Sequence, residues 1–508
     1  MLGPFIFHAL GISLAVLAFL VFGRGIVRKA KGKGFNPLPA FVLILVAVAF
    51  QLIFGGSAMT GKLAGLLVDF GIGMMIASLY LSIRKERAKL FWVPGAMALG
   101  LGGVMSIFSF CMTAFNHDIK SSQTTTEILV ELGPDDHLEE IKDILDKYNA
   151  VAEKAFPEVD LSEDEDLAQY YLIFVDSSMK DPLTLELNND PENVDQWAFN
   201  NPVSLIEPFA GNETMRPPTQ FLADDPFLNQ QWFADKLDYN SVYEFLKSHK
   251  PKKKVKVAIV DTGVDKDHED ISSVYTKSGG DGDYDKHSHG THCGGLAGAA
   301  TNNGKGVGSL NWDGDFITLS GYPALDDQGR GTDRRVANAI INAAEGGADV
   351  ISMSLGGFSP FGAPKAQVDA IKYARKKGAI VVVAAGNSND DARRYSPANI
   401  DGVIVVSAID ENLNKASFSN TNTKLKMPIA APGVNILSSV PGSEYQSYNG
   451  TSMATPIVSG LIGIMKSYNP SLTAEEVHKI LVNTGKQVKD SDRVGKVINP
   501  RAAIEAIH

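Results

Sequence analysis

Residues 254–264 read KVKVAIVDTGV, and this stretch decides the fold class. Its first part is apolar and β-branched, which is typical of a strand buried on both faces of a parallel sheet. Asp261 ends the run, and Thr262 with Gly263 begins a turn. Active sites of α/β proteins are built at the carboxyl ends of such strands, so the pattern predicts an α/β fold with Asp261 at its functional edge. A lone aspartate in such a loop is common, so this stretch alone does not decide the function.

Two further segments carry side chains suited to catalysis. Residues 288–293, SHGTHC, hold His289 and His292, but they lack the H-E-x-x-H pattern and the third ligand of a zinc site. Residues 379–389, AIVVVAAGNSN, predict a buried strand that runs into a tight turn with Asn387 at its tip. An amide donor at that position can hydrogen-bond an oxyanion.

The last such segment is GTSMATP at residues 450–456, which opens an apolar helix predicted over residues 453–465. Ser452 stands at the N-terminus of this helix, where free N–H groups and the helix dipole favour developing negative charge. Pro456 is placed in the first turn, where a missing N–H costs little.

In the order Asp, His, Asn and Ser, these segments resemble the subtilisin-like serine proteases, the subtilase family, itself a standard example of this order. The resemblance covers residues 227–508 and implies a three-layer α/β fold around a parallel sheet, with serine endopeptidase activity that needs no cofactor for its chemistry. It implies that Asp261 orients His289, which moves the proton of Ser452 while an acyl-enzyme forms. The Asn387 amide and the Ser452 N–H are expected to hold the oxyanion.

The resemblance also implies where a peptide substrate binds. One wall is expected from Ser354, Leu355, Gly356 and Gly357, and the opposite wall from Gly329, Arg330 and Gly331. A peptide between these walls would add a strand, so its backbone supplies affinity and the side-chain pockets supply selectivity. Arg330 at the rim either favours an acidic substrate side chain or is simply a solvated arginine.

A structural calcium ion is a further implication of the resemblance. Asp270, Asn303 and Val307 stand at positions that match the calcium ligands of the family, and carboxylate, amide and carbonyl oxygens suit Ca²⁺. One extra residue before Asn302 and the presence of Lys305 in the loop depart from the family pattern.

The first 112 residues predict a multi-pass membrane region. Four apolar runs have the ~20 residues that a bilayer-crossing helix needs, at residues 1–22, 38–56, 63–82 and 91–112. Lysine and arginine are concentrated in the first and third gaps between these runs, and basic loops stay in the cytoplasm. Four spans then place the protein in the cell membrane with everything after residue 112 on the extracytoplasmic side.

Between the membrane region and the protease-like segment, residues 120–210 predict a small α+β domain with a ferredoxin-like β-α-β-β-α-β order. It resembles the family's propeptide, an intramolecular chaperone and inhibitor, in size, strand order and position. Residues 211–226 are expected to be a linker, with self-cleavage between residues 208 and 221. Helices are expected over residues 138–148 and 191–199, and strands over residues 127–132, 149–156, 170–175 and 203–207.

The charge of the chain supports this division. The formal net charge of −11 argues against nucleic-acid binding, and two cysteines exclude a disulfide scaffold. The average hides three segments, because residues 1–120 carry +8, residues 121–220 carry −18 and residues 221–508 carry −1.

The sequence therefore predicts a membrane-anchored, extracytoplasmic serine endopeptidase made as a self-inhibited zymogen. Its expected partners are a peptide or protein substrate, its own propeptide domain and the lipid bilayer. The alternative is an inactive pseudoprotease receptor whose groove only binds peptides. A transporter with an accessory protease would need charged or broken membrane helices, for which only Asp69 qualifies.

Overall fold

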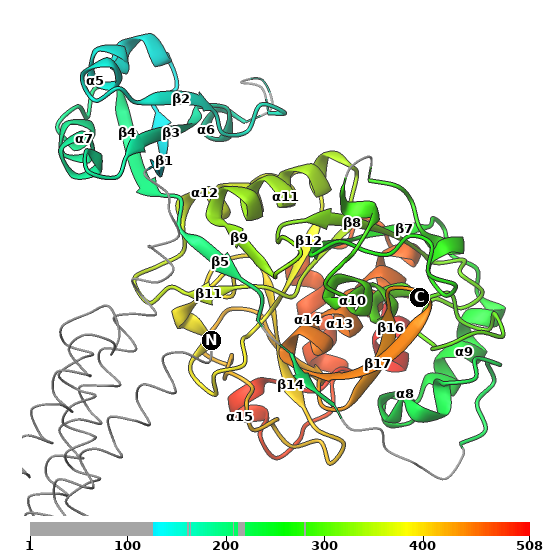
Figure 1. Ribbon diagram of the computed structural model, residues 1–508. Helices are drawn as coiled ribbons and strands as arrows, with labels where there is room; N and C mark the ends of the chain where they lie inside the picture. The colour runs from blue at the N-terminus through cyan, green and yellow to red at the C-terminus, as the bar shows by residue number, and fades with distance from the viewer. Residues whose placement is uncertain (1–124, 160–161, 163, 207, 212–218, 279–280) are drawn as a thin grey trace, which may run out of the picture. The chain divides into compact units, whose positions relative to one another are not determined.

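The computed structural model describes residues 125–508 except 160, 161, 163, 207, 212–218, 279 and 280. The predicted membrane region at residues 1–112 lies outside the described residues. Among the helices that are described, none is both long enough and apolar enough to cross a bilayer. The described chain has an N-terminal domain at residues 125–210 and a C-terminal domain at residues 219–508 (Figure 1).

The N-terminal domain is a four-stranded antiparallel sheet with the order β2-β3-β1-β4. Its elements follow the β-α-β-β-α-β order of a ferredoxin-like fold, with a short extra helix, α6, before β3. The elements are β1 (Thr125–Leu132), η1 (Leu138–Ile141), α5 (Lys142–Lys147), β2 (Val151–Lys154), α6 (Glu165–Ala168), β3 (Tyr170–Asp176), α7 (Lys180–Asn188) and β4 (Val194–Phe199).

Two expectations for this domain were wrong. The helix predicted over residues 191–199 is instead strand β4, which pairs with β1, and the second helix is α7. The missed signal is the spacing of Leu183 and Leu187, which lie four residues apart and are both buried in the domain core. The strand predicted over residues 203–207 does not join this sheet, because β5 (Pro202–Ser204) pairs with the C-terminal domain.

The C-terminal domain is built on a six-stranded parallel sheet with the order β15-β14-β12-β10-β7-β8. Along β7, alternate side chains enter different cores: Val257 and Ile259 belong to one, Ala258 and Val260 to the other. Both faces of the sheet are therefore buried, as the continuous apolar run predicted. The strands are β7 (Val255–Asp261), β8 (Ile317–Pro323), β10 (Val350–Met353), β12 (Ile380–Ala384), β14 (Ile404–Ile409) and β15 (Pro428–Pro432).

Helices cover both faces of this sheet and complete the predicted three-layer α/β architecture (Figure 1). Helices α10 (His289–Gly298) and α13 (Thr451–Tyr468) pack on one face, and α11 (Asp333–Glu345) and α12 (Lys365–Lys376) pack on the other. Because all six strands are parallel, their carboxyl ends lie at one edge, where the predicted functional segments follow β7, β10 and β12.

Smaller elements surround this core. A three-stranded antiparallel sheet has the order β16-β17-β6, and two-stranded pairs join β5 to β9 and β11 to β13. The remaining elements are β6 (Phe209–Ala210), η2 (Leu228–Gln230), α8 (Trp232–Lys236), α9 (Tyr239–Ser248), η3 (Ser272–Val274), η4 (Asp281–Asp283), β9 (Arg330–Thr332), β11 (Gly357–Phe358), η5 (Ala392–Arg394), β13 (Tyr395–Ser396), β16 (Ile436–Val440), β17 (Glu444–Asn449), α14 (Ala474–Thr484), α15 (Ser491–Val494) and α16 (Pro500–Glu505).

Candidate active site

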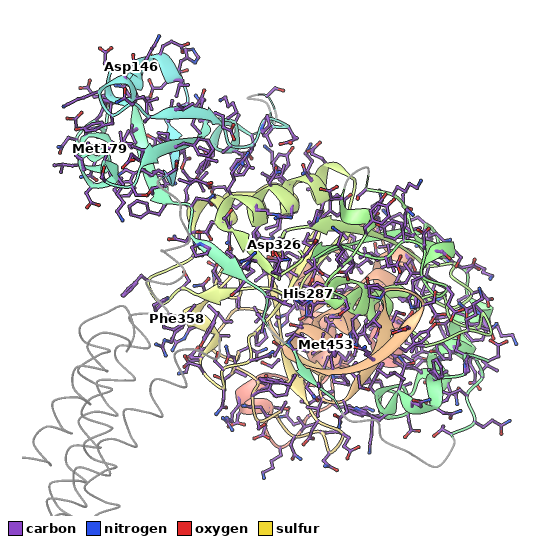
Figure 2. The ribbon with its side chains drawn as sticks, in the orientation of Figure 1. Asp146, Met179, His287, Asp326, Phe358 and Met453 are labelled. Atoms are coloured by element: carbon purple, nitrogen blue, oxygen red, sulfur yellow. The ribbon has the colours of Figure 1, made fainter. Side chains whose placement is uncertain are left out.

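The fold brings the four predicted catalytic side chains to one edge of the parallel sheet. Asp261 is the last residue of β7, His289 the first of α10 and Ser452 the second of α13, while Asn387 follows β12. Figure 2 labels two neighbours that mark the place, Met453 at the start of α13 and His287 just before α10. The side chains of Asp261, His289 and Ser452 are fully buried.

The aspartate and the histidine form a direct contact. His289 Nδ1 lies 2.7 Å from Asp261 Oδ1, which also accepts the Thr262 N–H at 2.8 Å. Burial by itself lowers the pKa of His289, but the negative charge of Asp261 and its hydrogen bond to the ring outweigh burial and raise this pKa well above its ordinary value. An imidazolium formed during proton transfer is therefore stabilised at this position.

The candidate nucleophile, Ser452, is not hydrogen-bonded to the candidate base, His289. Ser452 Oγ donates to the Ser354 carbonyl at 3.2 Å and to the Ile206 carbonyl at 3.3 Å. His289 Nε2 is buried and has no hydrogen-bond partner among the residues that the structure describes. Catalytic hydrogen bonds are often long before a reaction begins, so an open acceptor nitrogen is compatible with a role as general base.

Pro456 lies inside α13 rather than in its first turn, which corrects the prediction. A proline there cannot donate to the carbonyl four residues earlier, which belongs to Ser452. That carbonyl instead accepts the Ser354 hydroxyl at 2.8 Å and lies 3.5 Å from Cys293 Sγ. The backbone of the nucleophile is thereby joined to the strand that was predicted to bind substrate.

Asn387 is fixed through its amide oxygen. Asn387 Oδ1 accepts both the N–H and the hydroxyl of Thr451, each at 2.9 Å. Its Nδ2 lies 3.2 Å from the point that a Cβ on Gly450 would occupy, so a side chain there would press on this amide group. The Asn387 N–H₂ is thus held beside the N-terminus of α13, as an oxyanion donor requires.

The two predicted substrate walls are also brought together, and the chain itself lies between them. In β5, Pro202, Val203 and Ser204 pair with Thr332, Gly331 and Arg330 of β9. The Leu205 N–H donates to the Gly329 carbonyl at 2.7 Å, and Leu205 forms a bridge to Leu355. The Ile206 side chain lies close to Gly356, since its Cδ1 is 3.5 Å from the point that a Cβ on Gly356 would occupy. Further along the chain, β6 pairs with β17.

The arginine at the rim already has its counter-charge. Arg330 Nη2 lies 3.2 Å from Asp326 Oδ2 and also donates to Gln328 Oε1 at 2.8 Å. Its side chain is 68% exposed. The interpretation as a solvated surface arginine is therefore favoured over a contact for acidic substrates.

The predicted calcium ligands lie around one loop. Asp270 accepts the Asn303 side chain at 3.2 Å and the Val307 N–H at 2.8 Å. Asp225, which the sequence did not indicate, is buried beside them and accepts the Asn302 N–H at 2.9 Å. Burial raises the pKa of Asp270 and raises the pKa of Asp225 to about 7. Asp225 lies 45 residues before Asp270, so no local motif links them.

His292 has a structural role. Its Nε2 lies 3.1 Å from the Ile436 carbonyl and 3.0 Å from the Gln446 carbonyl, and burial lowers its pKa to about 3. The ring is therefore neutral and joins α10 to β16 and β17.

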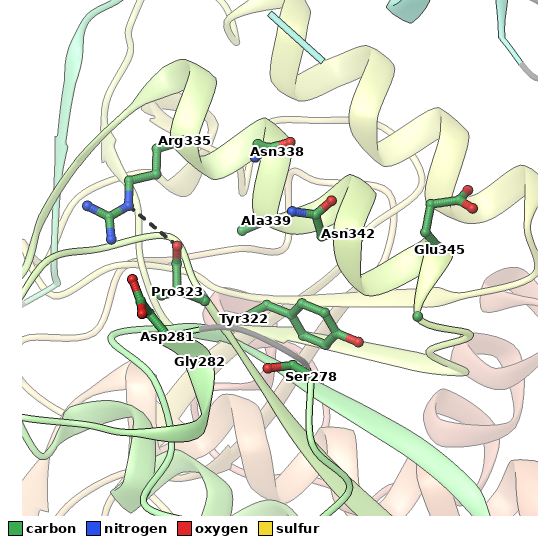
Figure 3. A pocket seen from close by; sticks show the side chains of 11 residues that line it. Ser278, Asp281, Gly282, Tyr322, Pro323, Arg335, Asn338, Ala339, Asn342 and Glu345 are labelled. Atoms are coloured by element: carbon green, nitrogen blue, oxygen red, sulfur yellow. Dashed lines mark hydrogen bonds between the residues drawn. The ribbon is translucent and has the colours of Figure 1, made fainter. Parts of the chain in front are cut away.

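A pocket of about 620 Å³ lies beside α11, with Tyr322 and Pro323 of β8 on its other side (Figure 3). Arg335 donates to the Pro323 carbonyl at its edge at 3.4 Å. Its lining contains none of the triad or substrate-wall residues, so it is separate from the candidate active site.

Comparison with known proteins agrees with this geometry. Residues 252–496 match the model of the subtilase family. Thermitase from Thermoactinomyces vulgaris is 40% identical over 238 residues, which cover 46% of this chain and 81% of that protein. Subtilisin DY from Bacillus licheniformis is 39% identical, covering 49% of this chain and 91% of the relative.

Two further matches extend the comparison. A thermophilic serine proteinase from a Bacillus species is 32% identical over 382 residues, covering 73% of this chain and 89% of the relative. Among solved structures, a protease from Pseudoalteromonas arctica matches with a TM-score of 0.50 and 28% identity, covering 56% of this chain and 99% of that one.

Proposed function

The chain belongs to the subtilase family of serine endopeptidases, and we propose that it is a membrane-anchored zymogen acting outside the cytoplasm. The observation that carries this proposal is the segment around Ile206, which lies across the candidate active site as a peptide substrate would.

In the proposed reaction, Ser452 Oγ attacks the carbonyl carbon of a peptide residue that stands where Ile206 stands. His289 Nε2 takes the hydroxyl proton, and the Asp261 carboxylate stabilises the resulting imidazolium. The Asn387 amide and the Ser452 N–H donate to the oxyanion. Collapse of the tetrahedral intermediate breaks the peptide bond, gives the leaving amine the proton from His289 and leaves an acyl ester on Ser452.

The N-terminal domain is proposed to inhibit the enzyme from which it is cut. Tyr170 of β3 donates to Asp369 of α12 at 3.0 Å, and Lys365 of α12 lies 3.3 Å from Glu131 of β1. Asp333 N, at the start of α11, donates to the Asn201 carbonyl at 3.0 Å. These contacts support a docked domain that holds the following strand in the substrate groove.

The match to the thermophilic serine proteinase supports the same proposal. It covers 73% of this chain, more than residues 227–508 can supply, so it includes sequence ahead of the protease-like segment.

The position of Ile206 beside Ser452 also changes the expected cleavage site. Self-cleavage was expected between residues 208 and 221, but the carbonyl beside Ser452 Oγ belongs to Ile206. The proposed cut is therefore between Ile206 and Glu207, with Val203, Leu205 and Ile206 on the acyl side.

N-terminal sequencing of the expressed chain tests this proposal. We expect the processed wild-type protein to begin at Glu207 and the Ser452→Ala chain to stay uncut, because the cut requires the serine. Ile206→Pro serves as a second variant, since it removes an N–H from the strand in the groove and is expected to slow the cut. A processed product of the same mass in the Ser452→Ala chain would show that another protease makes the cut.

Anchoring in the membrane rests on residues 1–112. Their four apolar runs and the uneven distribution of basic residues support an extracytoplasmic location for the protease. Cleavage after Ile206 would separate the protease from this anchor.

Calcium is proposed as a structural ion at the loop of Asn303. No lysine or arginine among the described residues pairs with Asp225 or Asp270, although both are buried. Two buried carboxylates with raised pKa values thus have no lysine or arginine to balance them, and a divalent cation would supply the positive charge. Asp225, Asp270, Asn303 and the backbone of Val307 would hold the ion, and its effect would be on stability.

We expect calcium to raise the melting temperature of the Ser452→Ala chain, a background that avoids self-digestion. At about 100 times the Kd, a bound ion contributes about 2.7 kcal/mol, or roughly 4–5 °C for a domain of about 290 residues. Asp225→Asn should abolish the calcium response, while Asp235→Asn, which alters an exposed carboxylate, should keep it. Equal melting curves in calcium and in chelator for the parent chain would contradict the site.

A further inference from the structure

A third carboxylate, that of Asp285, lies behind the aspartate and the histidine of the triad. Asp285 is 7% exposed, and its Oδ1 accepts the hydroxyl of Thr262, the residue after Asp261, at 3.0 Å. Its Oδ2 accepts the N–H and the hydroxyl of Thr291, two residues after His289, at 2.8 Å and 2.7 Å. One side chain thus contacts the strand end that carries Asp261 and the helix that carries His289.

The same carboxylate holds the backbone that leads into His289. Asp285 Oδ1 accepts the N–H groups of His287 at 2.9 Å and Ser288 at 3.0 Å. Ser288 has a φ of +85°, a conformation that is unfavourable for a residue with a side chain. Such a conformation persists where its surroundings fix it, and Asp285 supplies two of the fixing bonds.

The turn after Asp261 and the start of α10 lie in close contact, so the hydrogen bonds of Asp285 can set the distance between them. A Cβ on Gly290 would lie 1.9 Å from the Gly263 carbonyl oxygen, so backbone meets backbone there. The Thr262 hydroxyl accepts the Gly290 N–H at 3.0 Å while it donates to Asp285. Thr262 therefore joins both turns, and Asp285 orients its hydroxyl.

We propose that Asp285 is a positioning residue that fixes the distance between Asp261 and His289 by holding Thr262 and Thr291. The proposal rests on the triad roles given above. Among the described residues, the hydrogen bonds of the Asp285 side chain go to Thr262, His287, Ser288 and Thr291, none of which is a substrate-wall residue, so Asp285 acts through Asp261 and His289. In the sequence, Asp281, Asp283 and Asp285 form an acidic cluster for which a solvated loop is favoured over a second cation site. The burial of Asp285 contradicts the interpretation as a solvated loop.

The decisive variants change Thr262 and leave every charge in place. Thr262→Val removes the hydroxyl, whereas Thr262→Ser keeps it. We expect Thr262→Val and Asp285→Asn to lower kcat by about 10–100-fold with KM on a short peptide unchanged, because small misplacements of catalytic groups cost rates of this order. Thr262→Ser should stay within about threefold of the parent.

The pH profile separates positioning from a general loss of structure. A weaker contact with Asp261 lowers the pKa of His289, so the acid limb of kcat/KM should move to lower pH in Thr262→Val. Asp283→Asn is the matched control, because Asp283 is equally buried but accepts from Tyr275 and Ser278, away from the triad. Asp283→Asn should leave both kcat and the acid limb unchanged.

A double-mutant cycle of Thr262→Val and Asp285→Ala completes the test. The two losses should be strongly non-additive, because each variant removes one end of the hydrogen bond between the Thr262 hydroxyl and Asp285. The proposal is overturned if Thr262→Val behaves like Thr262→Ser, or if Asp285→Asn lowers thermal stability without moving kcat or the acid limb. If the Ser452→Ala variant kept its activity, the proposed triad itself would be wrong. That result would distinguish a failure of the proposed function from a failure of the proposed role of Asp285.

Discussion

The Ser452→Ala chain is expected to lose peptide hydrolysis by about 10⁶-fold in kcat, the size already known for the triad serine of subtilisin. The physical reason is that Ser452 Oγ is the atom that forms the covalent bond, and it lies 3.3 Å from the carbonyl oxygen of the residue proposed for cleavage. The uncut variant also keeps its own segment around Ile206 in the groove, so the loss should be at least of this size and KM is not compared. Hydrolysis of a short fluorogenic peptide by the processed wild type and the variant measures the loss.

The control removes a hydroxyl from the same helix. Ser459 is as buried as Ser452, and its Oγ only donates to the Thr455 carbonyl at 3.0 Å. Ser459→Ala should therefore keep its activity and its labelling by a serine-directed fluorophosphonate, whereas Ser452→Ala should lose both. Absence of labelling in the wild type would favour the alternative, a pseudoprotease that only binds peptides.

The second large effect concerns Asp261. Asp261→Asn should lower kcat by about 10⁴-fold, the size known for this exchange in Ser-His-Asp proteases. The new amide can present N–H₂ to His289 Nδ1, which then has to accept, so the proton moves to Nε2. A protonated Nε2 cannot take the proton of Ser452.

Kinetics across pH test this interpretation. KM and the melting temperature should stay close to the parent values, because the exchange keeps the size of a fully buried side chain. Asp283→Asn provides the control for the same chemical change at a buried site outside the triad. A loss below tenfold in Asp261→Asn would mean that His289 is oriented by some other group.

Local patterns were sufficient to select the four candidate catalytic residues that the fold brings to one edge of the sheet. Asp261 follows a continuous apolar strand and Ser452 opens an apolar helix, so the parallel sheet and its burial on both faces could be inferred before the distances were known. The sequence could not show that Asp285 is buried, because its partners Thr262 and Thr291 approach it only after the strand and the helix have packed. Asp225 was missed for the same reason.

The N-terminal domain was predicted less well. Its helix α7 was missed because the apolar pair Leu183 and Leu187 stands among charged and polar residues, and its last strand was mistaken for a helix. The proposed cleavage site could not be placed from composition, since the position of Ile206 depends on pairing between β5 and β9, whose paired residues lie 126 to 130 positions apart.

The proline inside α13 has a mechanical consequence. Because Pro456 leaves the Ser452 carbonyl free to accept the Ser354 hydroxyl, the residue proposed to attack is hydrogen-bonded to the segment proposed to bind the peptide. We expect a long substrate, which would pair with more of that segment than a short one, to express part of its extra binding energy as rate rather than as tighter binding.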